Sequence, residues 1–169
     1  DMRKEPVGWR ECGFNDSSWT APFIGWQDHV FVKTDIQPLQ VWRADPVLVK
    51  EIEPGHYFYD FGTELTGHTR IRLKGPEGHV LEVRHGEELE APDTVRYRLR
   101  ATCTYQEFPI LSGRDDAIEL FDYKGFRYLE ILHAPVKPEV WVMVRHYPFN
   151  PGASAFTVSE PILESIWAL

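Results

Sequence analysis

The sequence has few cysteines, no long apolar run and fewer cations than anions. Its two cysteines, Cys12 and Cys103, are too few for a disulfide framework, and their spacing matches no zinc signature, so we expect two free thiols. A single bridge is the alternative in an oxidising compartment. No apolar stretch approaches the roughly 18 residues that a membrane span needs.

The charge balance limits the partners of the chain. Lys and Arg number 18 against 26 Asp and Glu, for a formal net charge of −8. So acidic a chain argues against nucleic acid or an anionic membrane surface as the main partner. No secretory signal pattern opens the sequence, but its start at Asp1 looks like a cut from something longer, so localisation stays unassigned.

Sequence signatures of common catalytic sites are also missing. No Gly-rich phosphate loop, nucleophile elbow or Ser/His/Asp arrangement is visible. The histidines form neither His-x-His nor His-x-x-x-His; they are His29, His56, His68, His79, His85, His133 and His146. Of these, His68 and His85 are placed to meet across strands, with a structural hydrogen bond as the expected role. The sequence therefore assigns no catalytic, cofactor-binding or metal-ligating residue.

What the chain does contain is period-two alternation, the pattern of half-buried strands. It is clearest in residues 57–75, where aromatic residues alternate in 57–61 and Ile and Leu alternate with cations in 70–74. Gly62 and Gly67 lie between these two runs and suit positions of positive φ. We predict two strands joined by a short turn.

Further strand-like runs are separated by turn signals about every 8 to 12 residues. They cover residues 29–34, 39–43, 47–52, 79–85, 97–99, 103–105, 117–123, 126–132 and 139–146. Residues 75–78 read as a hairpin connection, and 139–146 is apolar enough for a central strand buried on both faces. The pattern predicts an all-β sandwich.

The C-terminal residues have a different pattern. Ser159 suits a helix N-cap, Glu160 and Pro161 suit the first turn, and apolar residues follow as far as Leu169. A helix of about ten residues is marginal on its own and must pack on something. Either it folds back on the sandwich or it opens a domain that the chain lacks, and we favour the second.

Four segments together resemble one family. Residues 59–67 (YDFGTELTG) resemble a DFG-x-N-x-x-G element, and residues 84–87 (RHGE) resemble RHAE. Residues 102–105 (TCTY) resemble TDTY, and residues 123–130 (YKGFRYLE) are similar to YHGFRYVEV. These elements, in this order, belong to bacterial α-L-rhamnosidases of glycoside hydrolase family 78. The chain departs from them at Glu64, Gly86 and Cys103, where the family has Asn, Ala and Asp.

The resemblance extends to both ends of the chain. Residues 5–20 look like the tail of a preceding β-domain, with its W-x-x-x-x-F-D-D-S-x-W pattern, and residues 156–169 resemble the junction that opens a helical catalytic domain. The family implies inverting hydrolysis of terminal L-rhamnose by two carboxylates in an (α/α)6 barrel. That barrel would follow residue 169, so no catalytic residue is carried over to this chain.

The resemblance and the strand pattern together define the expected fold and role. We expect an antiparallel β-sandwich (jelly-roll or concanavalin-like) with a short C-terminal helix. Residues 1–35 are expected to be irregular or the tail of a preceding β-domain, 36–155 the sandwich, and 156–169 the start of a helix. The expected role is that of a non-catalytic accessory domain whose partner is the helical catalytic domain of the same parent. The alternative is a stand-alone carbohydrate-binding module for rhamnose-containing glycans.

Two acidic clusters have both functional and structural interpretations. Glu87, Glu88 and Glu90 can be an acid/base pair or a solvated acidic loop, and the loop is favoured because mobile neighbours are poorly held for catalysis. Asp115 and Asp116 can help to bind calcium, but a bare pair lacks ligands, which favours turn chemistry. Asn15, Asp16 and Ser18 offer further oxygens. Calcium therefore stays unassigned, and no cofactor is predicted.

Two other groups of residues bear on function. Arg127 sits on an alternating strand, and we predict a structural ion pair between sheets, with Asp60 as one candidate partner. The six tryptophans either fill a β-sandwich core or stack against sugars. A binding module requires two or more aromatics exposed together in a groove beside polar groups.

Overall fold

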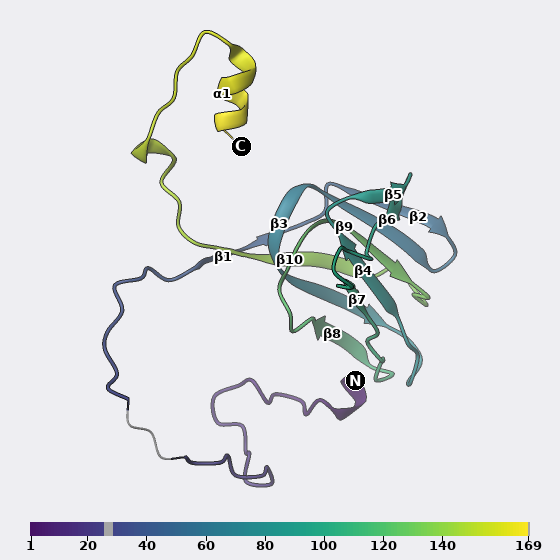
Figure 1. The fold of residues 1–169 in the computed structure, drawn as a ribbon. Coiled ribbons are helices and arrows are strands. Elements are labelled where there is room, and N and C mark those ends of the chain that lie inside the picture. Colours follow the sequence, from purple (N-terminus) through teal and green to yellow (C-terminus); the bar gives the residue numbers. More distant parts are fainter. Residues whose placement is uncertain (26–28, 169) are drawn as a thin grey trace.

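The computed structural model describes residues 1–25 and 29–168. Within these ranges the strands are β1 (Gln40–Ala44), β2 (Leu48–Glu53), β3 (His56–Lys74), β4 (Glu82–Gly86), β5 (Leu89–Ala91), β6 (Thr94–Val95), β7 (Gln106–Glu107), β8 (Asp115–Glu119), β9 (Lys124–Leu132) and β10 (Glu139–His146). The helical elements are η1 (Met2–Lys4), η2 (Pro151–Ala153) and α1 (Pro161–Trp167). The predicted fold class, antiparallel strands with a short C-terminal helix, is confirmed (Figure 1).

The prediction of two strands with a turn between Gly62 and Gly67 is wrong, because β3 runs unbroken through both glycines. Asp60 pairs with Tyr128, and Leu65 pairs with Phe126. Between these two pairs β3 advances by five residues while β9 advances by two. The surplus residues form a bulge in which Gly62 has a φ of +81°. At Gly67 a Cβ would lie 2.4 Å from the Met143 carbonyl oxygen. The glycines thus serve a bulge and a close strand contact, not a chain reversal.

The two halves of β3 pair with different neighbours. The first half lies between β2 and β9, and β4 and β7 continue the sheet beyond β9. The second half lies between β10 and β8, with β1 beyond β10. Side chains from both halves belong to one hydrophobic core, so the sheet folds over on itself into two layers that share β3.

The core is built from alternate residues of these strands. β3 supplies Tyr57, Tyr59 and Phe61 from its first half and Ile71 and Leu73 from its second. Tyr59 is 1% exposed, and its hydroxyl donates to the Pro138 carbonyl oxygen at 3.0 Å, which satisfies its buried polar atom. The other core residues include Leu81, Val83, Leu111, Ile118, Phe126, Leu129, Ile131, Val140, Val142 and Val144.

Most of the other predicted strands are present, with three corrections. No strand forms in residues 29–34, where Val30, Phe31 and Val32 are exposed and no described strand pairs with them. β10 is central, between β1 and β3, but it is buried on one face only, because alternate residues such as Trp141 stay partly exposed. Residues 75–78 do not join a hairpin, since β3 does not pair with β4.

The predicted strand pieces at 97–99 and 103–105 come together through a single isolated bridge, Arg98 to Thr104. The chain reverses between them at Ala101 and Thr102, whose φ values are 56° and 63°. Backbone bonds join Leu99 to Cys103 and Tyr105 to Tyr97. This small hairpin covers one side of the region that carries the four family-like segments.

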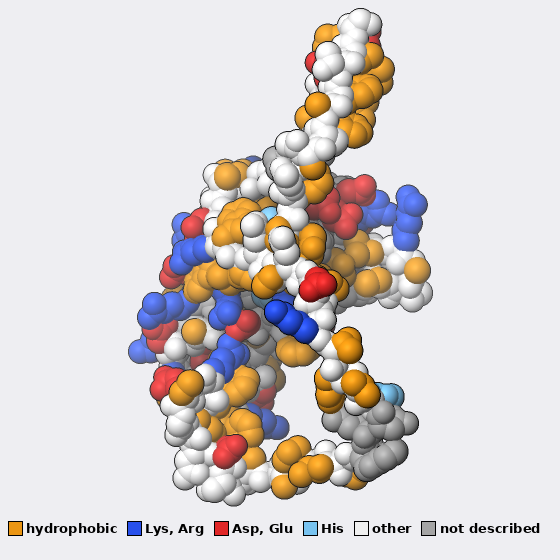
Figure 2. Space-filling view, turned by 90° about the vertical axis from the view of Figure 1, so that its left-hand side faces the viewer, with side chains coloured by type: hydrophobic (Ala, Val, Ile, Leu, Met, Phe, Trp, Pro, Cys, Tyr) orange, Lys and Arg blue, Asp and Glu red, His pale blue; other side chains and the backbone are white. Residues whose placement is uncertain are grey.

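The C-terminal helix is present, but its predicted cap is wrong. The N-cap is Glu160, without a side-chain cap bond, and Pro161 opens the helix as predicted. α1 stands away from the sheet on an extended connection, and the N-terminal residues loop away on the other side (Figure 1). Hydrophobic side chains gather on both extensions (Figure 2). In the described part of the chain no helix is long and apolar enough to cross a membrane.

Candidate functional site

The four family-like segments, far apart in sequence, meet in one region of the fold, here called the motif junction. Gly67 of β3 pairs with Lys124 of β9, and His85 of β4 pairs with Leu129 of the same strand. The His85 amide donates to the Tyr105 carbonyl oxygen at 3.0 Å, which attaches the fourth segment. Two hollows open at this junction and share Cys103 in their walls.

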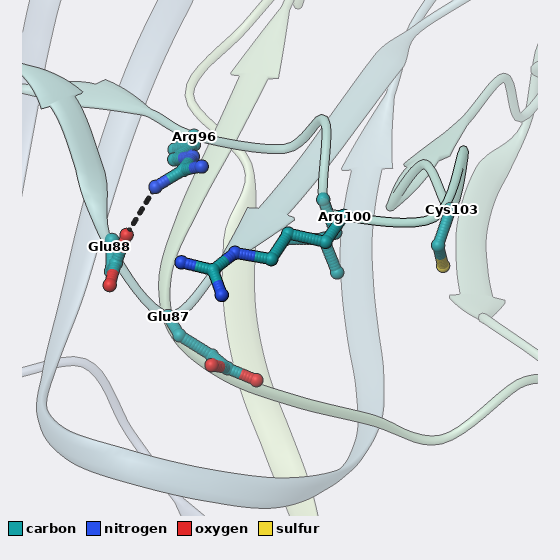
Figure 3. Close-up of a pocket in the computed structure, with 6 residues that line it drawn as sticks. Glu87, Glu88, Arg96, Arg100 and Cys103 are labelled. Atoms are coloured by element: carbon teal, nitrogen blue, oxygen red, sulfur yellow. Dashed lines mark hydrogen bonds and ion pairs between the residues drawn. The ribbon is translucent and has the colours of Figure 1, made fainter.

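The first hollow, the charged pocket, measures about 380 Å³. Its lining residues are Glu87, Glu88, Arg96, Leu99, Arg100 and Cys103. Arg96 Nη1 donates to Glu88 Oε2 at 2.7 Å, and the side chain of Arg100 extends toward Glu87 across the pocket (Figure 3). Within the described ranges, Glu87 and Arg100 form no side-chain hydrogen bond or ion pair. The pocket therefore holds one ion pair, between Glu88 and Arg96, and two further opposite charges, those of Glu87 and Arg100, that are not paired.

The three carboxylates of the acidic loop thus lie in two different hollows. Glu87 and Glu88 line the charged pocket, whereas Glu90 lines a separate hollow beside Arg84 and Arg98. Glu88 is neutralised by Arg96, and all three carboxylates lie on exposed residues. Within the described residues, Glu87 is thus the one unpaired carboxylate of the charged pocket.

The second hollow, the aromatic groove, measures about 790 Å³. The rings of Tyr105, Phe121 and Tyr123 line it together with the polar side chains of His68, Asp122, Lys124 and Arg145. Phe121 is 91% exposed and Tyr123 is 64% exposed. These rings were not predicted from the sequence, where only the tryptophans were considered as sugar-stacking residues. Phe121 and Tyr123 fall in the strand predicted over residues 117–123, but β8 ends at Glu119, so both lie in the connection to β9.

A buried polar cluster lies behind the groove. His85 is 1% exposed, and its Nε2 is 2.8 Å from Thr69 Oγ1. Lys124 Nζ donates to Glu107 Oε1 at 2.8 Å and lies 5.8 Å from the centre of the Tyr105 ring. His85 Nδ1 has no hydrogen-bond partner, and Glu107 Oε2 is 3.6 Å away. Burial, assisted by the nearby Lys124 charge, lowers the pKa of His85 to about 3, so the ring is neutral at physiological pH.

His68 and His85 do not form the predicted contact. His85 bonds instead to Thr69, the neighbour of His68, because successive side chains of β3 point to opposite faces. His68 lines the groove, with Nδ1 3.4 Å from the Leu120 carbonyl oxygen and its ring 6.1 Å from that of Tyr123. One histidine therefore faces the groove and the other the core.

The predicted pairing of Arg127 with Asp60 is confirmed. Arg127 Nε donates to Asp60 Oδ1 at 2.8 Å, and Nη2 donates to Oδ2 at 3.0 Å. The contact joins the neighbouring strands β3 and β9 rather than two sheets. Asp60 Oδ1 also accepts the Gly62 amide at 2.7 Å, which ties the ion pair to the bulge in β3.

Three of the residues considered for calcium, Asp115, Asp116 and Asn15, have other partners. Asp115 pairs with Arg72 at 2.6 Å, and Asp116 accepts bonds from the amide and hydroxyl of Ser112. Asn15 Oδ1 accepts the Ser17 amide, a turn contact. Among the described residues no group of three or more His, Cys, Asp or Glu side chains is arranged to hold a metal ion. The prediction of free thiols is confirmed, since Cys12 and Cys103 are both free and exposed.

None of the described tryptophans belongs to the buried core, so the prediction that they fill it is wrong. Trp9 and Trp19 are 39% and 50% exposed, with ring centres 6.4 Å apart, and Trp42 and Trp167 are also exposed. Trp26 lies outside the described residues. The condition set for a binding module, exposed aromatics together in a groove beside polar groups, is met at Phe121 and Tyr123 rather than at a tryptophan.

Comparison with known proteins gives a consistent result. Residues 50–146 match the family described as the bacterial alpha-L-rhamnosidase concanavalin-like domain. A curated alpha-L-rhamnosidase from Streptomyces avermitilis is 31% identical over an alignment that covers 98% of this chain and 17% of that protein. A second, from Alteromonas sp., is 26% identical and covers all of this chain and 20% of that protein. The chain thus spans at most a fifth of these relatives.

Solved structures agree. The Streptomyces avermitilis alpha-L-rhamnosidase complexed with L-rhamnose matches with a TM-score of 0.73 and 28% identity, over 99% of this chain and 17% of that one. An alpha-L-rhamnosidase from Aspergillus terreus matches with a TM-score of 0.72 and 27% identity, over 98% of this chain and 20% of that one. In both, the similarity covers one part of a much longer chain.

Proposed function

Since this chain belongs to the bacterial α-L-rhamnosidase family, in which it matches the concanavalin-like domain, we propose that it is the accessory β-domain of an α-L-rhamnosidase-like glycoside hydrolase. Its role is to support a helical catalytic domain in the same parent chain. The observation that carries this proposal is the coverage: nearly the whole chain aligns with 17% to 20% of each curated relative. The relatives therefore hold most of their residues in other parts.

The site geometry supports a non-catalytic role. An inverting glycosidase holds an acid and a base roughly 6.5–9.5 Å apart on opposite sides of the scissile bond. In the part of the chain that the structure describes, Glu87 is the one unpaired carboxylate of the charged pocket, because Glu88 is paired with Arg96 and Glu90 lines a different hollow. Hydrolysis is therefore assigned to the partner domain.

The C-terminal extension is the proposed contact with that domain. On α1 the apolar residues Ile162, Leu163, Ile166 and Trp167 are between 44% and 59% exposed. Within this extension, the ring of Trp167 packs near the ring of Phe156, with 5.5 Å between ring centres. A short helix with so large an exposed apolar face gains stability by packing on a partner.

The test compares the isolated chain with its full-length parent. The isolated chain is expected to show no turnover of an aryl α-L-rhamnoside, whereas the parent hydrolyses it. In the parent, Ile166→Glu is expected to lower the melting temperature, and in the isolated chain it should change little, because Ile166 is exposed there. Turnover by the pure isolated chain would refute the accessory role.

The second candidate function is a stand-alone carbohydrate-binding module. The exposed rings of Phe121 and Tyr123 beside polar side chains favour it. The two functions differ in the parent, where a binding module can be deleted without destabilising the helical domain. Neither function requires a cofactor, and we expect the melting temperature to be the same in calcium and in a chelator.

A further inference from the structure

We propose that the aromatic groove binds a pyranose ring of the glycan, with Phe121 and Tyr123 as stacking platforms and Asp122 and Arg145 as hydrogen-bonding groups. This inference rests on the proposed function for the class of ligand, a neutral rhamnose-containing glycan. It adds a sugar-binding site on the β-domain, at the motif junction.

The first support is the exposure of two aromatic rings in one hollow. Phe121 and Tyr123 lie two residues apart in the connection from β8 to β9, and both line the groove. A Phe side chain that is 91% exposed forgoes the stabilisation that its burial in the core would give. Aromatic side chains gathered in a hollow with polar neighbours mark a contact site rather than ordinary surface.

The second support is the polar lining. Asp122 and Arg145 both line the groove, and within the described ranges neither side chain forms a hydrogen bond or ion pair. A carboxylate only accepts hydrogen bonds and a guanidinium only donates them. A ligand that satisfies both must carry hydrogen-bond donors and acceptors. Sugar hydroxyls do so, and the C–H face of a pyranose ring is apolar enough to stack on an aromatic ring.

The third support is that one wall of the groove lies on paired strands. His68, Lys124 and Arg145 come from β3, β9 and β10, which are paired around Gly67. The Lys124 side chain is fixed by its bond to Glu107 and lies over the Tyr105 ring. This strand wall, which carries Arg145, loses little conformational freedom when a ligand binds.

The size of the groove suits a small ligand. Its volume of about 790 Å³ falls in the usual range of small-molecule sites, roughly 300–1,000 Å³. Cys103 lines both the groove and the charged pocket, so the two hollows are neighbours at the motif junction.

The experiment titrates the 169-residue chain with methyl α-L-rhamnopyranoside and follows binding by saturation-transfer NMR and calorimetry. Saturable binding is expected with a dissociation constant at or below about 10 mM. Phe121→Ala, Tyr123→Ala and Arg145→Met are each expected to weaken binding by about tenfold. Phe149→Ala is the matched control, because Phe149 is 82% exposed and does not line the groove. Sorbitol, an acyclic polyol without a ring face to stack, is expected not to bind.

Each other outcome overturns the inference. If the unmodified chain shows no saturable binding, the proposed sugar site does not exist. If binding survives both Phe121→Ala and Tyr123→Ala, the sugar binds outside the aromatic groove. If the same variants instead abolish association with a separately expressed helical domain, the groove is an interdomain surface and the inference fails. None of these results bears on the accessory role, because that role is refuted by a different result, turnover of the rhamnoside by the isolated chain.

Discussion

Asp60 and Arg127 form a two-point contact across neighbouring strands, with N–O distances of 2.8 Å and 3.0 Å. The Arg127 hydrogen bonds, and after them the Gly62 amide, lower the pKa of Asp60 against the opposing effect of burial. The carboxylate therefore stabilises the fold when ionised. This contribution is complete above the unfolded pKa of about 3.9 and is lost as the pH falls through the lower folded pKa.

The first prediction is that Asp60→Asn destabilises the chain at neutral pH and much less in acid. Urea denaturation at about pH 7 and about pH 2 measures the two differences in unfolding free energy from the unmodified chain. Asp45→Asn is the control, because its contact with Arg43 is between exposed side chains and is expected to contribute little. An Asp60→Asn difference that is equal at both pH values contradicts the ionised-pair explanation.

A second prediction concerns His85, whose pKa falls to about 3 in the folded chain, chiefly because it is buried. The unfolded chain takes up a proton near pH 6.5, while the folded chain does not until about pH 3. Stability should therefore fall as the pH drops from about 6.5 to 5, with a slope approaching 1.4 kcal/mol per pH unit at the lower end.

His85→Gln tests this, because an amide can keep the bond to Thr69 but does not titrate. Unfolding free energies measured across that pH interval should show a shallower slope in the variant. A slope that is the same with and without His85 would assign the pH dependence to another group.

The third prediction contrasts two glycines of the motif junction. A Cβ at Gly86 would lie 2.6 Å from Val95 Cγ1 and 2.7 Å from the Arg96 carbonyl oxygen, whereas at Gly125 the nearest atom is 3.7 Å away. Gly86→Ala is expected to cost about 1–3 kcal/mol, because the backbone at Arg96 must move, and Gly125→Ala much less. Chemical denaturation of both variants checks this, and equal losses would contradict it. Gly86 is also a position where the family-like motif has Ala.

The fourth prediction separates core from groove. Phe126 is fully buried, with edge contacts to Phe61 at 5.7 Å and His85 at 4.7 Å. Phe126→Ala should destabilise by about 3–5 kcal/mol. Phe121→Ala should stay within about 0.5 kcal/mol of the unmodified chain, because Phe121 is 91% exposed. Thermal and urea unfolding measure both, and a large loss from Phe121→Ala would show that this ring packs in the fold.

The strands that the sequence predicts best are those whose alternation reflects burial on one face, such as residues 126–132. Alternation alone was misleading at 29–34, because a strand also needs a neighbour to bond with, and local sequence does not supply one. That β3 is one continuous strand could not be predicted for a similar reason. A glycine in a bulge and a glycine in a turn look alike until the register with β9 is known.

The candidate site was harder to predict than the fold. The family-like segments marked the motif junction, and the Asp60–Arg127 pair was identified from a charged residue on an alternating strand. The groove itself is assembled from His68, Tyr105, Phe121 and Arg145, which lie on four separate parts of the chain. Only tertiary structure brings such residues together, and single aromatics in a connection carry no distinctive local pattern.

The position of β3 in both layers has a consequence for motion. Over Tyr57–Asp60 and again over Arg70–Arg72, its backbone bonds to a neighbour on each side, so these stretches have no free edge from which to fray. Opening the fold at either stretch must therefore break backbone bonds on both sides of β3. Native-state hydrogen exchange should therefore find the slowest amides of the chain in β3, released only when the whole domain unfolds in a single step.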